Sequence, residues 1–143
     1  MPTDEASRTV HVQAALEEVL ATIRAVDHQP EWVPEIRTAE VLERADDGLP
    51  LKARFTAATP VGTDEYTLAY SHRDDGLDWS LVAGKLQTGQ DASYRLAAAG
   101  GGTDVTFSLR ISHNLPLPGF LRRKVINGLV DSTLGGLTAR VDG

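Results

Sequence analysis

Hydrophobic and polar residues alternate over residues 8–13, where Val10 and Val12 share one side of the chain. A period of two is typical of a half-buried strand, so we expect the first strand here. Over residues 14–26 hydrophobic residues recur every three or four positions, which predicts a short amphipathic helix. Two prolines within residues 27–34 allow at most one or two further helical turns before the chain must extend. We therefore predict a strand followed by two short helices.

The middle of the chain consists of short hydrophobic runs separated by turn-forming residues. The breaks contain glycine, proline or aspartate, which favour turns, and short breaks favour antiparallel neighbours. Five or six strands are expected, in the ranges 36–44, 51–58, 63–72, 77–82, 87–98 and 103–112. Together with the first strand they predict an antiparallel sheet of six or seven strands.

The end of the chain has a helical pattern. From Gly119 on, hydrophobic residues fall on one half of a helical wheel for about twenty residues. A long helix with one apolar half needs a covering surface, so we expect the sheet to lie against it. Gly128, Gly135 and Gly136 lie toward the other half and indicate either close packing or a loose helix. One sheet beside separate helices predicts the α+β class.

Four short segments carry a resemblance to a known family through their order and spacing. They are LEEV at 16–19, PEWVP at 30–34, YTLAY at 66–70 and LPGFL at 117–121. With them the chain resembles the polyketide cyclase/dehydrase and coenzyme-Q-binding branch of the START-like, or SRPBCC-type, superfamily, from about residue 8 to residue 141. The resemblance implies the helix-grip fold. In that fold a single domain, here residues 1–143, wraps a curved antiparallel sheet around the C-terminal helix and encloses an apolar cavity.

Alternation within the strands, placed in the cavity that the resemblance implies, gives a set of candidate ligand-binding residues. They are Trp32, Phe55, Tyr66, Leu68, Tyr70, Trp79, Leu81, Tyr94, Phe107, Ile126, Leu129 and Thr133. For Trp32, a ligand contact at the cavity mouth and packing onto the core are both open. For each tyrosine we favour core packing over a hydroxyl that orients a ligand. A bulge near Gly62, Gly84 or Gly89 would shift the inward-facing set downstream.

Arginine positions bear on whether the chain is an enzyme. Aromatase/cyclases of the resembled family are thought to steer a polyketide with an arginine in the cavity. Arg54 and Arg95 lie in predicted strands but match no such site, and we interpret them as exposed. Arg122, Arg123 and Lys124 begin the last helix. They either hold an anionic ligand head or a lipid at the cavity mouth or, as we favour, form a solvated basic cluster.

Carboxylates and histidines show no arrangement that identifies a catalytic or metal site. Asp64, Glu65 and Asp91 would serve dehydration chemistry only if they converged, and we favour surface positions on the strands. The histidines are scattered without metal-ligand spacing, at His11, His28, His72 and His113. The catalytic residues stay unknown, and no metal or other cofactor is expected.

Composition limits the remaining classes of protein. The 143 residues include no cysteine, which excludes disulfides, thiolate metal sites and cysteine nucleophiles. A net charge of -6 argues against a nucleic-acid partner. No apolar run reaches the length of a membrane span, and the acidic start lacks the pattern of a signal peptide. We therefore predict a cytoplasmic protein, a monomer or homodimer, without stable membrane insertion.

Three functions fit these expectations. The first is binding of a hydrophobic small molecule, such as a lipid, an isoprenoid quinone or a polyketide, in the apolar cavity. The second is a polyketide aromatase/cyclase or dehydratase that uses the same cavity. The third is a chaperone-like interaction protein, whose sign would be an exposed apolar patch. Polar groups that converge inside the cavity would favour the enzyme over the binding module.

Overall fold

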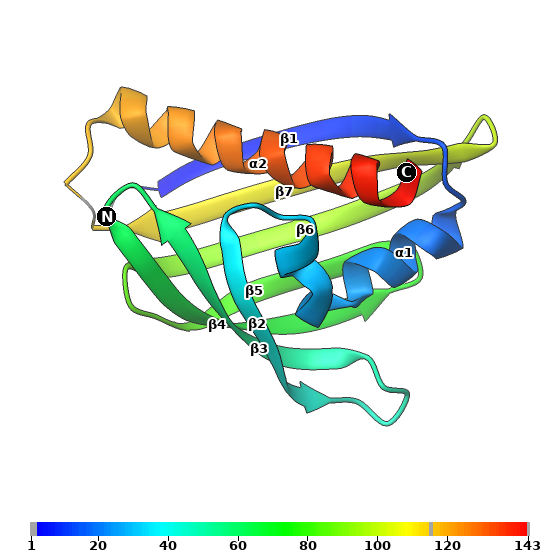
Figure 1. Ribbon diagram of the computed structural model, residues 1–143, viewed down its shortest axis with the longest axis horizontal. Coiled ribbons are helices and arrows are strands. Elements are labelled where there is room, and N and C mark those ends of the chain that lie inside the picture. Colours follow the sequence, from blue (N-terminus) through cyan, green and yellow to red (C-terminus); the bar gives the residue numbers. More distant parts are fainter. Residues whose placement is uncertain (1–2, 115, 143) are drawn as a thin grey trace.

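A curved antiparallel sheet holds a long C-terminal helix on one of its faces (Figure 1). The structure, a computed structural model, describes residues 3–114 and 116–142. Its helices are α1 (Leu16–Arg24), the short 3-10 helix η1 (Val26–Glu31) and α2 (Gly119–Asp142). Its strands are β1 (Thr3–Val12), β2 (Ile36–Arg44), β3 (Pro50–Thr59), β4 (Gly62–Arg73), β5 (Gly76–Gly84), β6 (Gln87–Ala99) and β7 (Gly102–His113). The predicted α+β helix-grip fold is confirmed.

The seven strands form one sheet in the order β1-β7-β6-β5-β4-β3-β2. Strands β2 to β7 each pair with their neighbours along the chain through short turns, as the turn residues predict. β1 instead pairs antiparallel with β7, which brings the start of the chain beside its last strand (Figure 1). β1 begins at Thr3, earlier than predicted, because its polar first half continues the pairing with β7 although it does not alternate in hydrophobicity.

The helix α2 packs along β1 and β7, while α1 and η1 lie beside it on the same face of the sheet (Figure 1). The buried residues of α2 are Ile126, Val130, Thr133, Leu134 and Leu137. Close packing accounts for Gly136, where a Cβ atom would lie 1.8 Å from the backbone oxygen of Trp32. Gly128 and Gly135 have open space at that position. Within the described ranges, no helix is long and apolar enough to cross a membrane.

Register shifts decide which side chains of the sheet face α2. Two of them occur near Gly84, between β4 and β5, and near Gly89, between β6 and β7, and others occur between β2 and β3. In β6 the pairing skips Thr88, so the two residues that flank it pair with consecutive residues of β7. One extra residue turns the following side chains to the other face. Gln87 and Gln90 are therefore both buried on the inner face despite their odd spacing.

Candidate functional site

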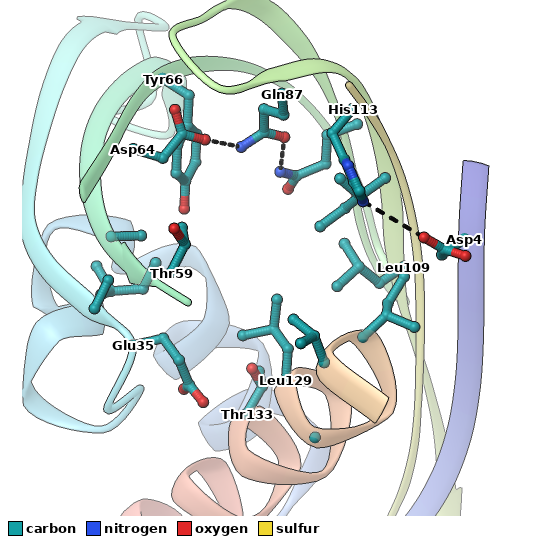
Figure 2. A pocket seen from close by; sticks show the side chains of 18 of the residues that line it. Asp4, Glu35, Thr59, Asp64, Tyr66, Gln87, Leu109, His113, Leu129 and Thr133 are labelled. Carbon is teal, nitrogen blue, oxygen red and sulfur yellow. Dashed lines mark hydrogen bonds and ion pairs between the residues drawn. The ribbon is translucent and has the colours of Figure 1, made fainter. Parts of the chain in front are cut away.

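A cavity of about 580 Å³ lies between the inner face of the sheet and α2. Strands β3 to β7 supply its walls, α2 covers it, and the segment around Val33 and Ile36 closes one side. Figure 2 shows side chains from several of these elements arranged around the open space. Ligand cavities of this size hold drug-sized molecules and are mostly apolar with a few polar groups. The cavity is therefore large enough to bind a small molecule.

Most of the residues predicted to bind a ligand line this cavity. They are Tyr66, Leu68, Trp79, Tyr94, Phe107, Ile126, Leu129 and Thr133. Trp32, Phe55 and Tyr70 are buried elsewhere in the core, and Leu81 is half-buried. These four lie outside the cavity lining. Contact with a ligand stays a prediction for the whole set.

Helix coverage and ring stacking explain why some inward-facing side chains miss the cavity. Phe55 stacks on Tyr66 with ring centroids 5.5 Å apart. Tyr70 lies near the end of β4, where Arg24 of α1 donates a hydrogen bond of 2.9 Å to the backbone carbonyl of Arg73. Strand alternation identifies the inner face of a sheet but not the part of that face that helices fill.

Three aromatic side chains form one wall of the cavity. Tyr94 and Phe107 are cross-strand neighbours in β6 and β7, and their rings stack with centroids 4.7 Å apart. Trp79 packs against both rings, at 5.6 Å from Tyr94 and 5.8 Å from Phe107. Aromatic contacts at these separations add to the stabilisation from burial. This wall is a continuous apolar surface of the cavity.

A chain of buried hydrogen bonds continues from this wall. The indole N–H of Trp79 donates to Gln90 Oε1 over 2.7 Å, and Gln90 Nε2 donates to Gln87 Oε1 over 2.7 Å. Gln87 Nε2 then donates to Asp64 Oδ2 over 2.9 Å (Figure 2). The other oxygen, Oδ1, accepts the backbone N–H of Leu86 over 2.8 Å. The chain runs from an aromatic donor to a carboxylate that is 3% exposed.

The direction of this chain is fixed at both ends. An indole N–H can only donate, so the oxygen of Gln90 must face Trp79. An ionised carboxylate can only accept, so the NH₂ group of Gln87 must face Asp64. Both amides are thereby held in one orientation. The carboxylate of Asp64 has two donors, both neutral, and retains lone pairs for a further donor.

The predicted surface position is wrong for Asp64, whereas Glu65 and Asp91 are exposed as expected. Asp64 alternates with Tyr66 and Leu68 on the inner face of β4. The alternation predicted for those two residues, continued back along the strand, would have found it. Gln87 had no such signal, because its inward direction depends on the register shift in β6.

A second polar group, made by Asp4, His113 and Arg122, lies on the β1 side of the cavity. Figure 2 shows Asp4 and His113 facing each other there. Arg122 Nε donates to Asp4 Oδ2 over 3.1 Å, and His113 Nε2 lies 3.5 Å from the same oxygen. Arg122 also donates to the backbone carbonyl of Leu117 over 3.1 Å. The predicted solvated cluster is therefore wrong for Arg122, whose charge is paired with Asp4. The prediction holds for Arg123 and Lys124, which are exposed.

Burial sets the protonation of the cavity tyrosines. Burial, and then the charge of Asp64, raise the pKa of Tyr66 well above its ordinary value. Burial alone raises the pKa of Tyr94. Both hydroxyls stay protonated at neutral pH, so each can donate and accept a hydrogen bond but cannot act as a base. Figure 2 shows the hydroxyl of Tyr66 pointing into the cavity.

The other charged candidates lie outside the cavity. Arg54 and Arg95 are exposed, as predicted, and Arg54 lies 3.4 Å from Glu40. Three of the histidines have hydrogen-bond partners outside the cavity lining, His11 with Asp104, His28 with Glu31 and His72 with the backbone of Pro50. In the part of the chain that the structure describes, no three acidic or histidine side chains are grouped to hold a metal ion.

Comparison with known proteins identifies the architecture. The family model described as "Polyketide cyclase / dehydrase and lipid transport" matches residues 3–142. A START superfamily protein from Mycobacterium smegmatis is similar with a TM-score of 0.88 and 24% identity, over 96% of each chain. The Zhui aromatase/cyclase from a Streptomyces species is similar with a TM-score of 0.80 and 11% identity, over 98% of this chain and 94% of the other.

A STAR-related lipid transfer protein from Xanthomonas axonopodis is similar with a TM-score of 0.76 and 18% identity, over 97% of this chain and 86% of the other. At these identities the likenesses show the shared fold. The comparison with curated proteins gives no match. The family model confirms the polyketide cyclase/dehydrase part of the predicted resemblance, and the coenzyme-Q-binding part stays a prediction.

Proposed function

We propose that this chain, which belongs to the polyketide cyclase/dehydrase and lipid transport family, binds a hydrophobic small molecule in the cavity between its sheet and α2. The proposal rests on one observation, a cavity of about 580 Å³ with a largely apolar lining. Affinity would come from burial of apolar surface, at about 0.8 kcal/mol for each CH₂ group removed from water. The polar groups would select and orient the ligand.

Two glycines of α2 provide a matched test of this proposal. Gly128 lines the cavity, and a Cβ atom there would meet no heavy atom within 4 Å. Gly135 has the same open space but does not line the cavity. The Cβ atom of a larger residue is therefore accommodated at either position, and a phenylalanine at position 128 is the one that adds volume beside the cavity.

The measurement is the fluorescence of Nile red, a neutral apolar dye, titrated with the protein and both variants. We expect Gly128→Phe to weaken dye binding by at least about tenfold, or about 1.4 kcal/mol. Gly135→Phe is expected to leave the affinity unchanged. Equal affinities of the two variants, or no dye binding to the unmodified protein, would refute the cavity as a hydrophobic binding site.

A second candidate function is that of a polyketide cyclase or dehydratase. It is supported by the polar side chains that converge in the cavity, since Asp64, Gln87 and Tyr66 all line it. The raised pKa of Tyr66 makes its hydroxyl a weak acid, which suits hydrogen bonding to a carbonyl better than proton transfer at neutral pH. Conversion of a poly-β-ketone chain by the protein, reduced by Asp64→Asn, would favour the enzyme over the binding module.

The proposal also covers the setting of the protein. We propose that the protein is a cytoplasmic monomer or homodimer. Its partner is a hydrophobic small molecule, and it has no nucleic-acid partner. The net charge of -6 supports the absence of a nucleic-acid partner. Light scattering of the purified protein after size-exclusion chromatography distinguishes monomer from dimer, and a larger assembly would contradict this part.

A further inference from the structure

The cavity has an unequal distribution of charge. Three carboxylates line it, those of Asp4, Glu35 and Asp64. Asp4 faces the guanidinium group of Arg122 and the ring of His113, as described above. Glu35 accepts a hydrogen bond of 3.0 Å from Ser132 Oγ, and Asp64 accepts only neutral donors. Among residues 3–114 and 116–142, neither Glu35 nor Asp64 forms an ion pair.

The basic side chains of the lining do not offset these two carboxylates. Arg122 and His113 already face Asp4. Lys124 lines the cavity but is exposed. An ion pair in water contributes little free energy, so Lys124 offers only weak attraction to an anionic head group. The interior of the cavity is therefore negative at Asp64 and Glu35. The positive charge of Arg122 is paired with Asp4, and that of Lys124 is exposed to water.

The acceptor at Asp64 is built in rather than adventitious. The hydrogen-bond chain from Trp79 fixes the orientation of both glutamine amides and ends on carboxylate oxygens. Reversal of the chain would point an amide NH₂ group at the indole N–H of Trp79, which cannot accept. The protonated hydroxyl of Tyr66 points into the same space (Figure 2). At this end of the cavity the carboxylate of Asp64 accepts hydrogen bonds from a fixed position, and the hydroxyl of Tyr66 can accept or donate one.

We propose that the cavity selects ligands whose polar group donates hydrogen bonds and carries no negative charge, a hydroxyl or an amine on an apolar body. A carboxylate, phosphate or sulfate head in this space would lose its hydration and face two unpaired carboxylates. A hydroxyl or ammonium group would instead donate hydrogen bonds to the carboxylate oxygens of Asp64 or Glu35. This inference deepens the proposed function and depends on it.

Three ligands with the same apolar chain test the selection, namely 1-decanol, decylamine and decanoate. Each is titrated against bound Nile red at neutral pH, where they are neutral, cationic and anionic. We expect 1-decanol to bind at least about tenfold more tightly than decanoate, which corresponds to about 1.4 kcal/mol. Decylamine tighter than 1-decanol would identify an amine as the preferred donor, and the reverse order would identify a hydroxyl.

Matched variants locate the cause of the selection. Asp64→Asn removes the inner charge, and Glu65→Gln removes the neighbouring exposed charge of the same strand. Glu35→Gln removes the second cavity charge and keeps an acceptor for Ser132, so it also serves if Asp64→Asn fails to fold. We expect the ratio of decanoate to decanol dissociation constants to fall at least about threefold in the Asp64 and Glu35 variants. It should stay unchanged in Glu65→Gln.

Two results would overturn the inference while the proposed function stands. The first is decanoate binding as tightly as 1-decanol to the unmodified protein. The second is the same selectivity in all three variants. If Nile red fails to bind, or if it binds and none of the three decyl ligands displaces it, the proposed function itself is refuted, and the two failures are therefore distinguishable.

Discussion

A single methyl group at Gly136 is expected to destabilise the protein, although alanine is normally the better helix residue. The Cβ atom of an alanine there would lie 1.8 Å from the backbone oxygen of Trp32 and 2.9 Å from its carbonyl carbon. Contacts of real Cβ atoms essentially never fall below 3.0 Å, so α2 and the Trp32 segment must separate by about 1 Å. A backbone group cannot rotate away as a flexible side chain would.

The magnitude follows from two opposing effects. Replacing glycine with alanine inside a helix favours folding by about 0.5–1 kcal/mol. Overpacking a close contact costs about 1–3 kcal/mol, and a clash with backbone belongs at the upper end. We expect Gly136→Ala to lower the free energy of unfolding by about 1–2 kcal/mol. Gly135→Ala, where the added atom meets open space, should raise it by about 0.5–1 kcal/mol.

Urea denaturation of the two variants and the unmodified protein measures both changes, and each kcal/mol shifts Tm by about 2–4 °C. Dye affinity should fall in Gly136→Ala as well, because Val33 and Thr133 line the cavity on either side of this contact. A Gly136→Ala variant as stable as Gly135→Ala would refute the reasoning, since it would mean that α2 does not approach Trp32 this closely.

Two further predictions concern charged groups. Arg122→Ala is expected to lower the free energy of unfolding by about 1–3 kcal/mol, because buried Asp4 loses a charged donor, and exposed Arg123→Ala by less than about 0.5 kcal/mol. Equal costs in urea denaturation would contradict this. The hydrogen bond and charge of Glu31 raise the pKa of His28, so their stabilisation is complete below the pKa of the unfolded histidine and disappears as pH rises through the folded value. His28→Gln should remove the fall in stability between these two pKa values, and an NMR titration that places the pKa of His28 below its ordinary value would show the reasoning to be wrong.

Much of the fold was predictable from local patterns. Alternation over β4 predicts the inward direction of Tyr66 and Leu68 because a strand surface repeats every two residues, and it holds without a shift across the β3–β4 pairing. Turn residues between consecutive strands predict their antiparallel pairing for the same local reason. The apolar half of the last helix likewise predicts Ile126 and Leu129 at the cavity.

The polar part of the site could not be predicted in the same way. The extra residue Thr88 turns Gln87 inward, and a single sequence does not show where a strand pairing skips. Asp4 and Arg122 meet because β1 pairs with β7 beneath α2, a contact between the two ends of the chain. Long-range contacts of this kind depend on topology and leave no local pattern.

The central claim, that the cavity holds a hydrophobic ligand, is tested most directly by NMR of the protein with 1-decanol. We expect nuclear Overhauser effects between the decyl chain and the methyl groups of Leu68, Leu109 and Leu129, which line the cavity. Overhauser effects confined to the exposed Phe120 and Val82, with none to the cavity methyls, would place the ligand on the outer surface and contradict the account.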